Sequence, residues 1–334
     1  MKISASIYSD KKRPLKEVIE DLDAHGVELL HVDCNDDLAV FEDIKAIRNW
    51  TNIPIDLHII TEHPEKYYDY LRQTPVEYVT FQYEDLKSPL EIPNDISGKK
   101  GLAIITPTSI DVFEDYPHFD FLLVMATIPG QSGGVFDQVN FSKIRQFKRK
   151  YPSKTVHVDG GVNGEVSFIL RNMGVYASVS GSYLFNAPSI GHALMNLTNR
   201  NIESHFVVKD FMIPKEECPI LSESQLNIES VLTSIDQGAL GFSIVVDQDQ
   251  MFKGIISNAD VRKAMIKALP DLNALNPLEM LNRKPLLIYE DQTVEEMLMT
   301  IKQSPIPIMY LPVISRDKSA VGVVNFMNLV KGEL

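Results

Sequence analysis

The sequence contains little cysteine, no long apolar segment and no excess of positive charge. Its two cysteines, Cys34 and Cys218, fall in what we expect to be separate domains, so we expect no disulfide and a cytoplasmic protein. No apolar run is long enough to cross a bilayer, and a strand-like pattern follows Met1 directly, where a signal peptide would be apolar. The net charge of −13 argues against nucleic acid or an anionic membrane as the partner.

The composition is that of an ordinary globular protein with more than one domain. Hydrophobic residues make up 44% of the sequence and charged residues 23%, a balance typical of folded proteins. The 334 residues exceed what one hydrophobic core usually organises. Because the pattern becomes polar over residues 199–206, we expect a linker there, a first domain at 1–198 and a second at 207–334.

Strand-like and helix-like segments alternate through the first domain. Such alternation produces parallel strands, and eight repeats favour a closed (β/α)8 TIM barrel over the alternative, a doubly wound open sheet. The expected strands cover residues 2–9, 29–33, 54–60, 78–81, 101–105, 121–125, 155–159 and 177–180. The expected helices include residues 15–25, 40–50, 64–71, 138–150 and 187–197.

Histidine and aspartate side chains stand at the ends of three of these strands. His31 and Asp33 share one strand face, although such a pair alone is more typical of a polar couple at the rim of a sheet. His58 lies near the end of the third strand, and Asp159 ends the seventh. Because the carboxyl ends of barrel strands meet at one mouth, the four residues predict a site for Zn²⁺, Fe²⁺, Mn²⁺ or Co²⁺.

Glycines occupy the loops after the last three expected strands. Bare backbone N–H groups in such loops bind phosphate well, and the last loops of a barrel are its usual phosphate site. Tight turns between strand and helix are the alternative reason for glycine here. The candidates are Gly130 and Gly133 after the sixth strand, Gly160 and Gly161 after the seventh, and Gly181 with Ser182 after the eighth.

Together these stretches resemble the ribulose-phosphate 3-epimerase family over residues 2–197. The motifs that carry the resemblance are Ser6-Ile7-Tyr8-Ser9, His31-Val32-Asp33, Asp56-Leu57-His58, Pro129-Gly130, Val158-Asp159-Gly160-Gly161-Val162 and Ser180-Gly181-Ser182. They follow the family's order and its approximate spacing.

The resemblance implies a role for each candidate residue. It implies that His31, Asp33, His58 and Asp159 bind one divalent metal ion, and that Asp33 and Asp159 also act as the acid/base pair. It further implies that Ser6 and His58 contact the sugar. The substrate phosphate would be held by Gly130, Gly133, Gly160, Gly161, Gly181 and Ser182.

The chemistry of epimerisation suits this set of residues. The C–H proton beside a ketone must leave on one face and return on the other, which two carboxylates on opposite walls can do. A divalent cation stabilises the oxyanion that develops meanwhile. The reaction needs no redox cofactor. We therefore predict epimerisation at C3 of a phosphorylated ketose, with D-ribulose 5-phosphate and D-xylulose 5-phosphate as the expected pair.

The segments that would cap the substrate depart from the family pattern. After Asp33 the family continues Met-Asp-Gly and a longer loop, whereas this chain has Cys34-Asn35-Asp36-Asp37 and then a helix. Ile60 replaces an expected methionine, and residues 128–132 differ from the family's Asn-Pro-Gly-Phe-Gly. The alternatives are therefore another sugar phosphate or a nucleotide-linked intermediate. His157 replaces a family acidic residue and is expected to fill the barrel interior.

The second domain contains an internal repeat of two similar halves, at about 207–270 and 273–334. The first half is predicted to contain a helix at 228–236, strands at 242–246 and 254–256, and a helix from Asn258. The second is predicted to contain a helix at 293–302, strands at 308–313 and 322–324, and a helix from Phe326. This arrangement resembles a pair of CBS domains.

One motif in the first half suggests nucleotide binding. The segment from Gly254 to Asp260 fits the CBS pattern in which Ser257 takes a nucleotide phosphate and Asp260 takes ribose hydroxyls. The alternative is a helix-capping box. The second half has Asn325 and Asn328 at these positions, so we predict one adenine-nucleotide site per chain.

The complete prediction is a cytoplasmic, metal-dependent epimerase whose barrel is fused to a CBS pair. We expect the CBS pair either to sense an adenine nucleotide or to promote dimerisation, and we expect a homo-oligomer. The non-enzymatic alternative is a nucleotide sensor whose barrel has lost turnover along with its capping loop.

Overall fold

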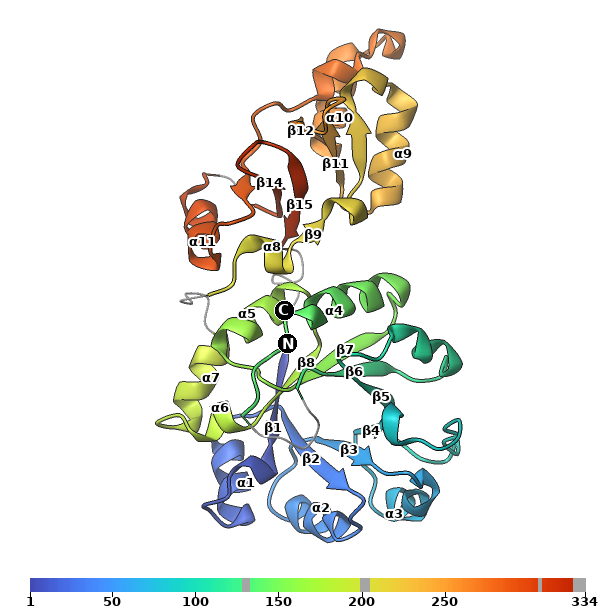
Figure 1. Ribbon diagram of the computed structural model, residues 1–334, viewed down its shortest axis with the longest axis vertical. Helices are drawn as coiled ribbons and strands as arrows, with labels where there is room; N and C mark the ends of the chain where they lie inside the picture. The colour runs from blue at the N-terminus through green and yellow to red at the C-terminus, as the bar shows by residue number, and fades with distance from the viewer. Residues whose placement is uncertain (128–132, 199–204, 306–307, 327–334) are drawn as a thin grey trace. The chain divides into compact units, whose positions relative to one another are not determined.

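The first domain is a closed barrel of eight parallel strands, seen in the computed structural model, which describes residues 1–127, 133–198, 205–305 and 308–326 (Figure 1). The strands pair in sequence order and β1 pairs with β8, so the barrel is confirmed and the open sheet is excluded. They are β1 (Lys2–Ser6), β2 (Leu29–Asn35), β3 (Ile55–Ile60), β4 (Tyr78–Gln82), β5 (Lys99–Ile105), β6 (Phe121–Met125), β7 (Thr155–Asp159) and β8 (Ala177–Ser180).

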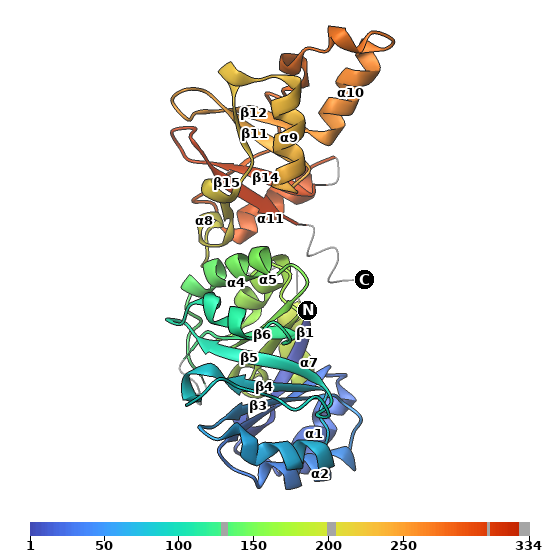
Figure 2. The same ribbon diagram turned by 90° about the vertical axis from the view of Figure 1, so that its right-hand side faces the viewer.

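The helices of this domain lie outside the strands (Figures 1 and 2). In α1, Val18, Ile19 and Leu22 recur at helical spacing and are buried, which explains why this segment folds onto the sheet. The α-helices are α1 (Leu15–Ala24), α2 (Val40–Arg48), α3 (Tyr68–Gln73), α4 (Val139–Lys150), α5 (Gly164–Asn172), α6 (Ser182–Phe185) and α7 (Ile190–Thr198). The 3-10 helices are η1 (Ile7–Ser9), η2 (Pro64–Tyr67), η3 (Tyr83–Asp85) and η4 (Ile110–Asp115).

The first strand is shorter than expected. The alternating pattern predicted a strand over residues 2–9, but β1 ends at Ser6 and η1 follows. In η1, Ile7 is buried and the Tyr8 hydroxyl donates a hydrogen bond to Asp43 on α2. These interactions stabilise η1 directly after Ser6, so Ser6 is the last residue of the strand.

The barrel interior is packed with apolar and aromatic side chains. A buried cluster contains Leu29, Tyr78, Ala103, Phe121, Leu123, Met125 and Ala177. His157 is 1% exposed and its ring stacks on Phe121 at a centroid distance of 4.1 Å, so it fills the interior as expected. The barrel interior is therefore a packed core and not a pore.

The C-terminal unit consists of two similar α+β halves and a connecting segment. The first half contains β10 (Ile220–Ser222), α9 (Ile228–Gly238), β11 (Phe242–Val246), β12 (Phe252–Ser257) and α10 (Asn258–Ala268). The second contains β13 (Ile288–Tyr289), α11 (Val294–Gln303), β14 (Tyr310–Ile314) and β15 (Ala320–Asn325). The other elements are α8 (Val208–Phe211), β9 (Ile213–Pro214), η5 (Lys215–Glu217), η6 (Glu223–Gln225), η7 (Leu272–Ala274) and η8 (Pro277–Met280).

The two halves repeat the same hairpin. Gly254 lies opposite Val245, and Gly322 lies opposite Val313, with a register shift one residue further along in both hairpins. The sheet orders are β10-β11-β12 and β13-β14-β15-β9. The internal repeat predicted from the sequence is thus present. The helix expected after Phe326 falls outside the described residues.

The structure also bears on the two cysteines and on membrane-spanning helices. Cys34 and Cys218 are not joined by a disulfide. Within the ranges that the structure describes, no helix is long and apolar enough to span a bilayer.

Candidate active site

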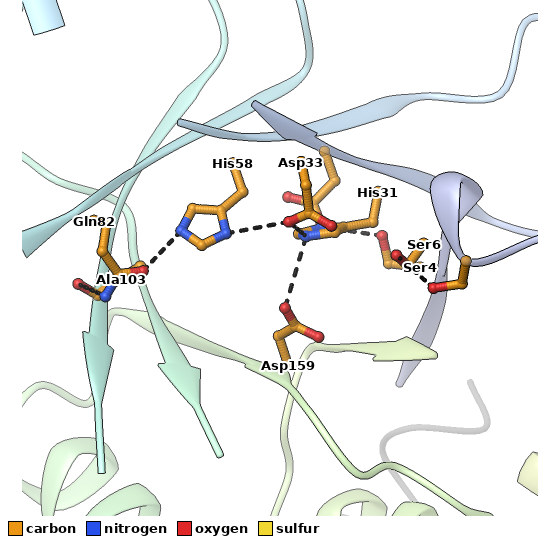
Figure 3. A network of polar contacts seen from close by, with 10 residues as sticks. Ser4, Ser6, His31, Asp33, His58, Gln82, Ala103 and Asp159 are labelled. Atoms are coloured by element: carbon orange, nitrogen blue, oxygen red, sulfur yellow. Dashed lines mark hydrogen bonds and ion pairs between the residues drawn. The ribbon is translucent and has the colours of Figure 1, made fainter. Parts of the chain in front are cut away.

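The candidate residues meet where the barrel strands end (Figure 3). On β2, His31 and Asp33 are two residues apart and share a face. The parallel pairing of β2 with β3 places Asp33 directly opposite His58, and β1 brings Ser6 opposite His31. Asp159 is the last residue of β7. Barrel closure, rather than any local sequence signal, brings these side chains to one mouth.

The four predicted ligands form one compact cluster. One ligand atom from each of His31, Asp33, His58 and Asp159 lies within 4.8 Å of the other three. His31 Nε2 is 3.2 Å from Asp33 Oδ1 and 3.8 Å from Asp159 Oδ2, and His58 Nδ1 is 3.6 Å from Asp33 Oδ1. Both histidines are buried, whereas Asp33 and Asp159 are 26% and 19% exposed. The two carboxylates are therefore accessible from outside, whereas the two rings are not.

These four residues fit a divalent transition-metal ion. Two imidazole nitrogens and two carboxylates form the mixed donor set that Zn²⁺, Fe²⁺, Mn²⁺ and Co²⁺ accept. His58 Nδ1 is buried and has no hydrogen-bond partner among the described residues. A buried ring nitrogen without a partner costs stability. A cation held between His58 and Asp33 would satisfy it.

Each histidine also contacts a polar group that the sequence analysis gave no role. His31 Nδ1 lies 3.0 Å from Asp56 Oδ2, and the Ser4 hydroxyl donates to the same oxygen at 3.0 Å. His58 Nε2 lies 2.9 Å from Gln82 Oε1 (Figure 3). Asp56 belongs to the motif Asp56-Leu57-His58. No sequence motif indicates a role for Gln82, because its contact with His58 depends on how β4 pairs with β3.

The two candidate catalytic carboxyls have different electrostatic surroundings. Burial raises the pKa of Asp33, but the adjacent His31 and His58 rings outweigh burial and hold that pKa well below its usual range. Burial raises the pKa of Asp159 to about 6; the charge of Asp33 adds to this effect and His31 opposes it. Burial lowers the pKa of His31, but Asp33 and Asp56 outweigh it and raise that pKa well above its ordinary value. The neighbouring carboxylates thus stabilise positive charge at this place, which also favours a metal cation.

At two of the candidate phosphate-binding positions, the backbone conformation requires glycine. Gly160 and Gly161 have φ angles of +109° and +67°, which side chains with a Cβ rarely adopt. A Cβ on Gly161 would lie 2.2 Å from the backbone nitrogen of Phe136, and one on Gly160 would collide with Thr127. The tight-turn explanation therefore accounts for both glycines. Phosphate binding there is an additional proposal.

Three of the remaining candidate phosphate-binding residues, Gly133, Gly181 and Ser182, lie on neighbouring segments. Ser182 begins α6 directly after Gly181. A Cβ on Gly133 would lie 3.8 Å from Ser182 Oγ, so the loop after β6 approaches the start of α6. Gly130 lies outside the described residues.

In the C-terminal unit, Ser257 and Asp260 form a helix-capping box at the start of α10. The Asp260 carboxylate accepts hydrogen bonds from the Ser257 backbone N–H and hydroxyl, and Ser257 Oγ accepts from the Asp260 N–H. Tyr310, from the second half, hydrogen-bonds to Ser257. The corresponding Asn325 ends β15, and Asn328 lies outside the described residues.

Solved CBS structures resemble part of the chain. The crystal structure of CBSX2 in complex with AMP matches with a TM-score of 0.33 and 17% identity, covering 38% of this chain and 96% of that one. A CBS domain pair in complex with 5′-methylthioadenosine and S-adenosyl-L-methionine matches with a TM-score of 0.32 and 21% identity, covering 38% and 95%.

The barrel matches a family model and curated relatives. The model of the ribulose-phosphate 3-epimerase family matches residues 2–185. The ribulose-phosphate 3-epimerase of Methanocaldococcus jannaschii is 31% identical over 228 residues, which cover 64% of this chain and 95% of the relative. That of Synechocystis is 28% identical over 214 residues, covering 59% and 93%. The chain is therefore an enzyme of the ribulose-phosphate 3-epimerase family.

Proposed function

We propose that the barrel interconverts D-ribulose 5-phosphate and D-xylulose 5-phosphate: one of Asp33 and Asp159 removes the C3 proton, and the other donates a proton to the opposite face. One observation carries the proposal: two partly exposed carboxylates, one from β2 and one from β7, lie in one compact cluster with the buried rings of His31 and His58 (Figure 3). A substrate carbon between two such groups can lose a proton to one and gain a proton from the other, which inverts its configuration.

The residues of the chain divide this work. His31, Asp33, His58 and Asp159 would hold one divalent metal ion, which when bound stabilises negative charge on the substrate's ketone oxygen. Asp33 or Asp159 accepts the C3 proton through a carboxylate oxygen, and the other carboxyl returns one to the opposite face. The buried rings beneath them keep water from that side of the site. The Ser6 hydroxyl, at the end of β1, is available to the sugar.

The phosphate would lie toward the loops after β7 and β8. The supporting observation is that Gly160, Gly161 and Gly181 present backbone without side chains next to the catalytic strand ends. Gly133 and Ser182 add a further N–H and a hydroxyl from adjacent segments. A sugar phosphate bound this way has its ketone end at the His–Asp cluster.

A different phosphorylated ketose is the second candidate substrate. Only residues 36–39 separate β2 from α2, so this connection is shorter than in the family pattern, as the sequence indicated. Turnover of a panel of phosphorylated ketoses by the metal-loaded protein tests the choice. The proposal predicts the highest kcat/KM for ribulose 5-phosphate, and a higher value for another ketose phosphate would reassign the substrate.

We also propose that the C-terminal unit binds one adenine nucleotide at the start of α10. Ser257 and Asp260 provide a hydroxyl, a helix N-terminus and a carboxylate, while Tyr310 brings an aromatic ring from the other half. The Tyr310 ring stacks on Phe242 at a centroid distance of 3.8 Å, so it is held in place. Calorimetry with AMP, ADP and ATP tests the proposal; the absence of binding at millimolar concentration would leave dimerisation as the function of this unit.

A further inference from the structure

Each histidine of the candidate metal cluster is hydrogen-bonded through the ring nitrogen that faces away from the cluster (Figure 3). We infer that Asp56 and Gln82 are positioning residues: each fixes the tautomer of one histidine, so that His31 presents Nε2 and His58 presents Nδ1 to the metal. The inference rests on the proposed metal-dependent function and extends it to two residues with no role so far.

The tautomer of His31 follows from the acceptor behind it. Asp56 Oδ2 lies 3.0 Å from His31 Nδ1, and both side chains are buried. The same oxygen already accepts the Ser4 hydroxyl, so the ionised carboxylate acts only as an acceptor here. Nε2 also lies within hydrogen-bond distance of a carboxylate, 3.2 Å from Asp33 Oδ1, and is 3.8 Å from Asp159 Oδ2. When a metal ion takes Nε2, the ring keeps one proton, and Asp56 holds that proton on Nδ1.

The tautomer of His58 depends on which end of the Gln82 amide faces it. The Gln82 NH₂ group donates to the Glu84 carboxylate and lies 3.4 Å from the Ala103 carbonyl oxygen, two groups that can only accept. The amide oxygen must therefore face His58, where it accepts the Nε2 proton at 2.9 Å. His58 Nδ1 keeps its lone pair, 3.6 Å from Asp33 Oδ1.

Glu84 is itself held, so the amide cannot easily reverse. Its other carboxylate oxygen accepts the backbone N–H of Ile105 at 3.0 Å. A chain of contacts thus runs from β5 through Glu84 and Gln82 to His58. The two histidines also differ in their support, because Asp56 places a negative charge behind His31 whereas Gln82 is neutral. Asp56 should therefore strengthen its histidine as a ligand more than Gln82 does.

Variants that lack the acceptor separate this role from simple packing. Gln82→Met removes the acceptor of His58 with little change in volume, and Asp56→Leu removes that of His31 with a larger side chain. Ser4→Ala removes a hydrogen bond to Asp56 but leaves the acceptor of His31 in place. The readout is zinc affinity of the full-length protein, measured by competition with a chelator, with circular dichroism as the check of folding. We expect affinity to fall about 10–100-fold for Gln82→Met, at least as much for Asp56→Leu, and little for Ser4→Ala.

Nitrogen NMR of the zinc-loaded protein with ¹⁵N-labelled histidine reports the tautomers directly. We expect the proton on Nδ1 of His31 and on Nε2 of His58, and loss of the single His58 tautomer in Gln82→Met. Wild-type protein that binds no divalent ion would overturn the metal site and this inference together. Tight zinc binding through the other nitrogens, or unchanged affinity in both Asp56→Leu and Gln82→Met, would overturn the inference alone.

Discussion

Replacing Asp159 by asparagine removes a proton-transferring group while keeping the shape of the side chain. Asp159 is partly exposed and its Oδ2 lies 3.8 Å from His31 Nε2, so the variant loses both an accessible carboxylate and a negative charge beside His31. Loss of one general acid/base group lowers turnover by about 10²–10⁴-fold, which corresponds to about 3–5 kcal/mol in the activation free energy.

The exchange of the C3 proton with deuterated water shows which face each carboxylate serves. In the wild type both epimers should exchange and interconvert. Asp159→Asn should exchange the C3 proton of only one epimer, because Asp33 still reaches one face of the substrate carbon. Asp33→Asn should exchange only the other epimer. The assay follows deuterium incorporation by proton NMR, starting from each sugar phosphate separately.

Metal content is the necessary control, because both residues are also proposed ligands. Exchange rates are therefore compared at equal occupancy of the divalent ion, adjusted by its concentration in the buffer. Full interconversion by Asp159→Asn at the wild-type rate would refute the two-carboxylate reasoning. So would exchange of the same single epimer in both variants, since the two groups would then serve one face.

Three further predictions concern other parts of the chain. Purified protein should carry close to one divalent ion per chain by elemental analysis, and a protein with no ion and no response to added metal would contradict the 2-His/2-Asp site. Burial lowers the pKa of His157 to about 4, so as the pH falls the unfolded chain takes up a proton at this residue before the folded protein does. Between about pH 6.5 and 4, His157 should therefore cost the barrel about 3 kcal/mol of its unfolding free energy. Denaturant titrations should show that this loss is absent from His157→Leu. A cation bound at Asp159 would lower this pKa further, so the sign is the same with metal present. An adenine nucleotide at 100 times its Kd should stabilise the C-terminal unit by about 2.7 kcal/mol, and calorimetry should find that Asp260→Ala abolishes this shift while Asn328→Ala retains it; two equal sites would contradict the asymmetry.

The elements and the candidate ligands were predictable because each rests on a local pattern. Apolar strands alternate with helices along the sequence, and the carboxyl ends of such parallel strands meet at one edge. This rule alone groups the four residues that the structure brings together, His31, Asp33, His58 and Asp159. The distances between these side chains, by contrast, depend on the closed order of the eight strands, which the structure supplies.

The supporting contacts were not predictable from the sequence. Gln82 is an ordinary polar residue at the end of β4, and its role depends on pairing between strands and on the direction of its amide group. The end of β1 at Ser6 depends on contacts of η1 with the rest of the barrel, notably Tyr8 with Asp43 on α2. Interactions of this kind join residues far apart in sequence, and no local periodicity reports them.

Turnover of D-ribulose 5-phosphate by the full-length protein, before and after chelation of divalent ions, tests the central claim most directly. The account predicts conversion to D-xylulose 5-phosphate, its loss on chelation, and its return when Zn²⁺, Fe²⁺, Mn²⁺ or Co²⁺ is added back. Conversion that persists undiminished in protein shown to be free of metal, or no conversion with any of the four ions, would contradict it.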